Sequence, residues 1–74
     1  MVNELRYRPS AKRWHAYRNG LYECPLHCGN LLAIQIGDGY FPCRLELDAD
    51  WYVEIGETKL RLHPKTVYRA MLLF

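Results

Sequence analysis

Apolar and polar residues alternate in short segments along most of the chain, which is the period-two pattern of β-strands that bury one face. The alternation is cleanest from Tyr40 to Leu47, where Arg44 and Glu46 lie opposite the apolar residues. Trp51–Ile55 repeats this pattern, and Leu31–Ile36 is almost continuously apolar, as in a mostly buried strand. The central part of the chain is therefore predicted to form short strands.

A hairpin is predicted around Asn19-Gly20, because this dipeptide adopts positive φ values easily and suits a type I′ turn. The flanking strands are Arg13–Arg18 and Leu21–Cys24. Near the C-terminus, residues 63–66 suit a single helical turn. The run from Val67 to Leu72 fits a helix or a strand, but its β-branched and aromatic start favours a strand.

These segments predict an all-β fold with an N-terminal hairpin and a strand meander. The first twelve residues contain Pro9-Ser10 and show no periodic pattern, so residues 1–12 are expected to form a flexible basic arm, with a weakly packed edge as the alternative. Residues 13–74 are then a single small domain. Six or seven short strands expose fewer edges when they curl into a barrel, so we expect an SH3-like barrel, with an OB-like barrel as the alternative. The expected core consists of Ile34, Phe41, Leu45, Trp51, Val53 and Leu60.

The chain is short and weakly charged overall. Its 74 residues carry a net charge of +2, which neither requires nor excludes a polyanionic partner. The two ends are basic and the centre is acidic, which allows either internal neutralisation or a two-signed binding surface. No apolar stretch is long enough to span a membrane and no signal peptide is visible, so we expect a cytoplasmic protein.

Three cysteines cannot form a closed set of disulfides, so reduced, buried thiols are expected. No cofactor and no metal are predicted. The alternative is a structural zinc site, which needs four tetrahedral ligands. The side chains available for it are Cys24, Cys28, Cys43 and His63.

The chain resembles a small family of unknown function from Gram-positive bacteria, their phages and mobile elements. The resemblance covers about residues 22–70. It rests on Leu26-His27-Cys28-Gly29 before an apolar strand, Phe41-Pro42 followed by Arg44-Leu45-Glu46, Trp51-Tyr52-Val53, and the segment from Leu60 to Val67 with Arg69. The resemblance implies a small β-barrel with no known reaction, in which the Leu-His-Cys-Gly turn is a structural feature.

No enzymatic activity and no catalytic residue are predicted. Ser10 is the only serine and lies in the expected arm, and adjacent His27 and Cys28 point to opposite faces of any extended segment. No phosphate-binding or dinucleotide-binding glycine motif is present. A binding protein is therefore expected.

Two kinds of partner are considered. The first is a protein, bound stoichiometrically through aromatic and acidic side chains of the central strands, as in an anti-CRISPR-like inhibitor of a host defence system. The residues expected to bind it are Tyr40, Asp48, Asp50, Tyr52 and Glu54. The alternative partner is a nucleic acid, bound by cations and aromatic rings of the N-terminal hairpin. The residues expected to bind it are Arg6, Arg8, Arg13, Trp14, Tyr17 and Arg18, with a place in the core as the favoured alternative for Trp14 in so short a chain.

A homodimer is a further expectation. Met71, Leu72, Leu73 and Phe74 form an apolar run that cannot all face inward from one strand. Exposed apolar residues of this kind often mark an interface, so these four residues are the predicted dimer contact.

Overall fold

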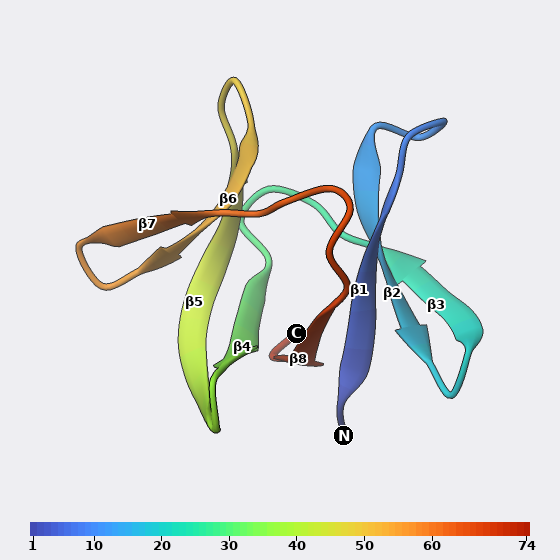
Figure 1. The fold of residues 1–74 in the computed structure, drawn as a ribbon, viewed down its shortest axis with the longest axis horizontal. Coiled ribbons are helices and arrows are strands. Elements are labelled where there is room, and N and C mark those ends of the chain that lie inside the picture. The colour runs from blue at the N-terminus through green and yellow to red at the C-terminus, as the bar shows by residue number, and fades with distance from the viewer.

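The computed structural model describes all residues from 1 to 74 and consists of one antiparallel sheet with eight strands. The strands are β1 (Asn3–Arg8), β2 (Arg13–Arg18), β3 (Leu21–Pro25), β4 (Leu31–Ile36), β5 (Gly39–Leu47), β6 (Trp51–Ile55), β7 (Thr58–Arg61) and β8 (Tyr68–Leu72). Figure 1 shows a strongly curved sheet with β1–β3 on one side and β4–β7 on the other. The all-β prediction is confirmed.

The C-terminal strand joins two meanders. The strand order is β3-β2-β1-β8-β4-β5-β6-β7, so β8 lies between β1 and β4. Asn3 pairs with Ala70 on one side of β8, and Ile34 pairs with Ala70 on the other. The expectation of a strand for the last apolar run is thus confirmed.

The core is built from alternate residues of both meanders. Leu5, Trp14, Leu32, Ile34 and Leu45 are fully buried. The ring of Trp14 stands edge-on to Tyr7 and Tyr68, with centroid distances of 5.6 and 5.5 Å. Because Tyr7 belongs to β1 and Tyr68 to β8, Trp14 packs the N-terminal meander against the central strand.

The sheet is not closed into a barrel by hydrogen bonds. β3 and β7 are its two edges and pair with one neighbour each. Contacts between side chains and loops bring the distant strands together instead: Trp51 Nε1 donates to the carbonyl of Lys12 at 3.3 Å. The expected closed barrel is corrected to an open, curled sheet, and its SH3-like class stays a prediction.

Two local predictions at the ends of the chain are wrong. Asn3–Arg8, expected within a flexible arm, forms strand β1 between β2 and β8 and buries the side chain of Leu5 fully. The charged residues around Leu5 make its strand pattern hard to recognise in the sequence. Residues 63–66 form a turn in which Thr66 N–H donates to His63 O at 2.9 Å, and the chain contains no helix. Pro64 fits this turn without any helical continuation.

The predicted hairpin is confirmed at Asn19-Gly20. Both residues have positive φ, 52° and 77°, as a type I′ turn requires. β2 and β3 pair across this two-residue turn, which sets Tyr17 opposite Tyr22; beyond that pair, a register shift between Ala16 and Tyr17 places Cys24 instead of Glu23 opposite Ala16. Such a shift re-aims side chains at the edge of a sheet.

The predicted core is correct for Ile34, Leu45, Trp51 and Val53 but wrong for two other residues, which are exposed. Phe41 remains 42% exposed and Leu60 38% exposed, although both share the core-facing side of their strands. Leu60 lies in the edge strand β7, and Phe41 lies near the β4–β5 turn. The open sheet leaves these two positions without a full covering layer.

Candidate functional site

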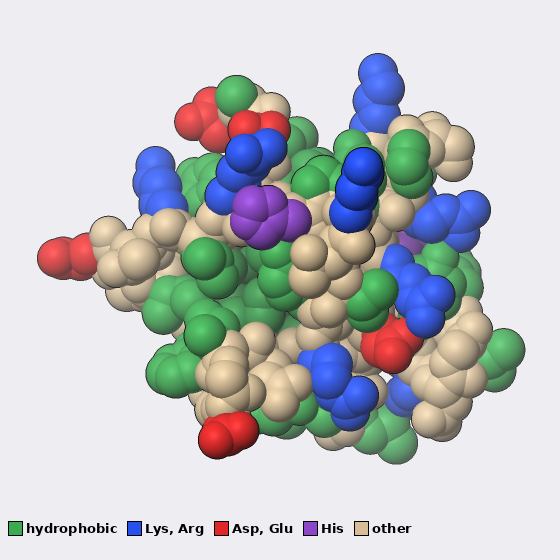
Figure 2. Space-filling view, in the orientation of Figure 1, with side chains coloured by type: hydrophobic (Ala, Val, Ile, Leu, Met, Phe, Trp, Pro, Cys, Tyr) green, Lys and Arg blue, Asp and Glu red, His purple; other side chains and the backbone are tan.

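The outer face of β1 and β2 carries an excess of cations. Alternation places Arg6 and Arg8 of β1 on the side opposite the core, with Glu4 as the carboxylate among them. Arg13 of β2 starts on the same side, and its guanidinium reaches across to the carbonyl of Leu26 and the ring of Trp51. Arg6 is paired with Glu4 at 2.7 Å, whereas no carboxylate lies within ion-pair distance of Arg8 or Arg13. Figure 2 shows Lys and Arg side chains spread over the half of the molecule that holds β1–β3.

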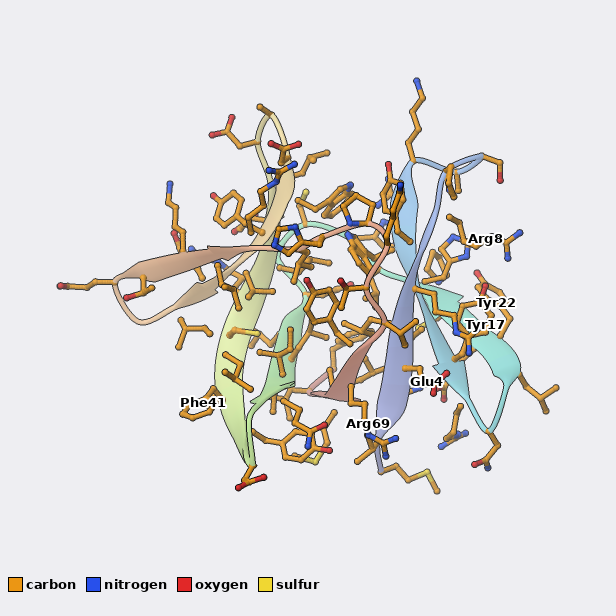
Figure 3. All side chains as sticks on the ribbon, in the orientation of Figure 1. Glu4, Arg8, Tyr17, Tyr22, Phe41 and Arg69 are labelled. Atoms are coloured by element: carbon orange, nitrogen blue, oxygen red, sulfur yellow. The ribbon has the colours of Figure 1, made fainter.

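Three aromatic rings lie beside these cations on the same face. Tyr22 of β3 contacts both Tyr17 and His15 of β2, with centroid distances of 5.9 and 5.1 Å. Arg6 lies 5.4 Å from the Tyr17 ring, and Arg8 donates to the Tyr17 hydroxyl at 2.8 Å. Figure 3 shows Arg8, Tyr17 and Tyr22 grouped at β2 and β3. We call Arg6, Arg8, Arg13, His15, Tyr17 and Tyr22 the basic aromatic face.

The electrostatics of His15 report the positive potential of this face. Burial and the guanidinium groups of Arg8 and Arg13 lower the pKa of His15 below its ordinary value of 6.5. Its Nδ1 atom is buried without a hydrogen-bond partner. At neutral pH the imidazole is therefore uncharged, and the surrounding guanidinium groups supply the positive charge.

The structure separates the six residues predicted to bind nucleic acid into two groups. Arg6, Arg8, Arg13 and Tyr17 lie together on the outer face, as just described. Trp14 is fully buried in the core, so it offers no stacking surface. Arg18, at the end of β2, pairs with Glu23 at 3.2 Å.

The acidic residues predicted to bind a protein are partly neutralised within the chain. Glu54 and Glu46 both pair with Arg44 on the outer face of β5 and β6. Asp50 lies 3.5 Å from Arg61, and no cation lies within ion-pair distance of Asp48. Of the acidic residues predicted to bind a protein, only Asp48, in the β5–β6 turn, has no ion-pair partner.

The predicted aromatic residues of this region lie on the same outer face as Glu54. Tyr52 is half-buried, and the ammonium of Lys59 lies 5.1 Å from its ring centroid. Tyr40 pairs with Gln35 near the β4–β5 turn and is also half-buried. Tyr40 and Tyr52 thus come from opposite ends of β5 and its partner strand.

A cleft of about 290 Å³ separates the β1–β2 turn from the β5–β6 turn. Both turns stand at the same end of the sheet in Figure 1. Aromatic and aliphatic walls combine here with charged groups at the two turns. The cleft is lined by Tyr7, Lys12, Trp14, Leu47, Asp48, Ala49, Asp50, Trp51, Leu62 and Pro64.

The residues of the zinc alternative are not brought together. Cys24 is in β3, Cys28 is exposed in the following loop and Cys43 is buried in β5. No three His, Cys, Asp or Glu side chains lie close enough to hold a metal ion. The Nδ1 atom of His27 lies 3.2 Å from the guanidinium of Arg13, within hydrogen-bond distance.

The apolar C-terminal run is divided between the sheet and the surface. Met71 and Leu72 are half-buried in β8, whereas Leu73 and Phe74 are 49% and 62% exposed. The structure contains no helix of the length and apolarity needed to cross a membrane.

Sequence reasoning missed His15, Tyr22 and the cleft. The signal for His15 was present, because it alternates with Arg13 and Tyr17 on one face of the predicted strand. The signal for Tyr22 was also present, because the predicted two-residue turn at Asn19-Gly20 sets Tyr22 opposite Tyr17. The cleft depends on two turns that are far apart in sequence.

The fold and these sites define a small all-β domain with a basic aromatic face and a separate cleft. The chain belongs to the family described as domain of unknown function DUF5348, whose model matches residues 3–72. The resemblance to an uncharacterised family is thereby confirmed, and the match includes β1. No curated protein and no solved structure matches the chain.

Proposed function

We propose that this protein binds single-stranded nucleic acid on its basic aromatic face. The observation that carries the proposal is the contact of Tyr17 and Tyr22 with each other, with Arg6 and Arg8 beside them on an accessible sheet surface. Unpaired bases stack on aromatic rings, and guanidinium groups contact phosphates. The alternation of β1 and β2 places both groups on one side.

Charge supports this choice over a protein partner for the same face. Three guanidinium groups accompany a single carboxylate on the outer face of β1 and β2, and Arg69 of β8 lies opposite that carboxylate, Glu4. Because Tyr22 is 54% exposed at the edge of the sheet, a base has access to it from solvent. An extended, flexible strand suits such a shallow surface better than a duplex.

The proposal is tested by fluorescence anisotropy with a labelled single-stranded oligonucleotide over a range of salt concentrations. Binding is expected to weaken steeply with salt, and Arg8→Glu should reduce both the affinity and the salt slope. Tyr22→Ala should weaken binding by about 1–3 kcal/mol through lost stacking. The matched control is Lys65→Glu, which makes the same charge change in the turn before β8. Equal effects of Arg8→Glu and Lys65→Glu would reject the basic aromatic face.

We propose stoichiometric protein binding through the β5–β6 turn as the second candidate. It is supported by the exposed Asp48, which has no ion-pair partner, in a turn that stands clear of the sheet. The resemblance to proteins of phages and mobile elements suits an inhibitor of a host defence system, and a small SH3-like fold suits stoichiometric binding of this kind. Affinity capture with the intact chain tests this candidate. Loss of a captured protein on Asp48→Lys with Asp50→Lys, but not on Arg8→Glu, is the expected result.

A further inference from the structure

The cleft between the β1–β2 and β5–β6 turns contains the two tryptophans of the chain. Trp14 and Trp51 line it but are only 0% and 7% exposed, so the apolar surface open to a ligand comes from Tyr7, Leu47, Ala49 and Pro64. Trp14 is fully buried, and its Nε1 has no hydrogen-bond partner. A planar ring with polar edges matches walls of this composition, and a volume of about 290 Å³ accommodates a single nucleobase.

The charged groups of the cleft differ from those of the basic aromatic face. Asp48 and Asp50 lie on one turn, and Lys12 lies on the other. Asp48 has no cationic partner. The ion pair between Asp50 and Arg61 is weak, because the two side chains are each 59% exposed to solvent. A carboxylate repels phosphate, so in a protein that binds nucleic acid it is useful where it accepts hydrogen bonds from a base.

The position of Lys12 connects the cleft with the basic aromatic face. Lys12 follows Arg8 by four residues in the β1–β2 turn and directly precedes Arg13, and its φ of 52° lies in the left-handed region. Its carbonyl accepts the hydrogen bond of Trp51 Nε1. A strand that lies along Arg8 and Arg13 therefore reaches the cleft at Lys12, where the ammonium is available to a phosphate.

We propose that this cleft binds a guanine base of the single strand, an inference that rests on the proposed function. Guanine presents neighbouring N1–H and N2–H donors on one edge, which match the two oxygens of a carboxylate. Adenine and uracil lack this pair of donors. The apolar side chains of Tyr7, Leu47 and Pro64 contact the faces of the base, and Asp48 or Asp50 accepts hydrogen bonds from its edge.

The tryptophans make the test direct, because both lie in the cleft. Guanosine 5′-monophosphate, adenosine 5′-monophosphate and uridine 5′-monophosphate are titrated separately into the intact protein, with excitation at the red edge of indole absorption. The expected result is saturable quenching with guanosine monophosphate bound about tenfold more tightly than the other two, the discrimination of one good bidentate contact. Equal response to all three nucleotides, or no response, would overturn the guanine site.

Asp48→Asn tests the role of the carboxylate without a large change in shape, and no hydrogen bond of its side chain is lost from the fold. The guanosine preference is expected to fall about tenfold in Asp48→Asn combined with Asp50→Asn. Asp38→Asn, a matched change in the β4–β5 turn, should leave the preference unchanged. An unchanged preference in the double variant would reject the assignment of these two residues.

Oligonucleotides separate failure of the cleft from failure of the proposed function. The probes are a uridine heptamer and the same heptamer with one central guanosine. Stronger binding of the guanosine heptamer, lost in the double variant, supports the cleft. Equal binding of both heptamers, still weakened by Arg8→Glu, overturns the cleft and leaves the basic aromatic face intact. Saturable quenching by arginine methyl ester and not by guanosine monophosphate would identify the cleft as a site for a basic side chain and also overturn it.

Discussion

The guanidinium of Arg13 lies over the indole ring of Trp51, 5.7 Å from its centroid. The same guanidinium donates to the carbonyl of Leu26 at 2.8 Å. Arg13 belongs to β2 and Trp51 to β6, which are not neighbours in the sheet. This contact therefore holds together two parts of a curled sheet that no strand pairing connects.

Arg13→Ala is expected to lower the free energy of unfolding by about 1–2 kcal/mol, through loss of a cation–π contact and of a hydrogen bond to Leu26. Arg13→Lys should recover part of this, since it keeps the charge but not the planar donor group. Urea denaturation followed by circular dichroism measures the difference. Arg69→Ala serves as the control for loss of an exposed arginine, and an equal loss in both variants would contradict the bridging role.

Trp14 should be the side chain on which stability depends most. Trp14→Ala removes a fully buried ring between Tyr7 and Tyr68 and is expected to cost about 3–5 kcal/mol. Trp14→Phe should cost clearly less, because it keeps an aromatic ring and removes the unpartnered indole N–H. Chemical denaturation measures both variants. A Trp14→Phe variant as unstable as Trp14→Ala would show that ring packing is not the main contribution.

Gly20 is expected to resist substitution because its φ of 77° lies in the left-handed region, although no atom lies within 4 Å of an added Cβ. Gly20→Ala should therefore destabilise the protein by about 1–2 kcal/mol through backbone strain alone. Asn19→Gly should change stability little, because glycine adopts the same φ. Thermal unfolding of the two variants distinguishes strain from steric contact, and a neutral Gly20→Ala would contradict the turn geometry.

The lowered pKa of His15 predicts a specific dependence of stability on pH. The native state favours the neutral imidazole, so the contribution of His15 is present above the pKa of the unfolded chain and is lost as the pH falls through the folded pKa. His15→Gln should remove this part of the acid sensitivity. The comparison of unfolding free energies at neutral and mildly acidic pH measures the effect.

The causes of the His15 shift give a second measurement. Arg8→Ala should raise the pKa of His15 towards its ordinary value, because Arg8 is one of the charges that lower it. A bound single-stranded oligonucleotide should also raise it, since phosphates counter the guanidinium groups of Arg8 and Arg13. NMR titration of the His15 ring follows both shifts. A His15 pKa that does not change with the oligonucleotide would place the phosphates elsewhere.

The three thiols should react in a fixed order with an alkylating reagent. Cys28 is exposed, whereas burial raises the pKa of Cys24 and of Cys43, and Cys43 is almost inaccessible. Cys28 should be modified first and Cys43 last, because alkylation needs an accessible thiolate. Mass spectrometry of the modified peptides records the order. Early modification of Cys43 would show that the β4–β5 region opens readily.

Local patterns predicted the strands better than their assembly. The Asn19-Gly20 turn and the alternation of β5 depend on neighbouring residues, and both are confirmed. β1 was missed because its buried side chains, Leu5 and the half-buried Tyr7, are interrupted by charges that belong to the outer face. We expected the sheet to close into a barrel because exposed edges are costly. The sheet instead stays open, and side-chain contacts of Trp51 with Lys12 and Arg13 join its two halves.

The candidate site was predicted only in part, because its residues come together through contacts between strands and turns that are distant along the chain. The cations Arg6, Arg8 and Arg13 were identified from composition and do share a face with Tyr17. Trp14 was grouped with them because it lies among basic residues in the sequence, yet alternation turns its ring to the core. The cleft could not be expected from the sequence, because it forms only when the β1–β2 and β5–β6 turns meet at one end of the sheet.

The place of β8 also has a consequence for biosynthesis. Residues 68–72 are the last of the eight strands to leave the ribosome, yet they separate β1 from β4. Until β8 is available, β1 and β4 each lack the neighbour with which they pair in the folded sheet. Final assembly is thus a late event that depends on pairings distant along the chain, and such topologies fold slowly. Between synthesis of β7 and docking of β8, the molecule would be most exposed to proteases and chaperones.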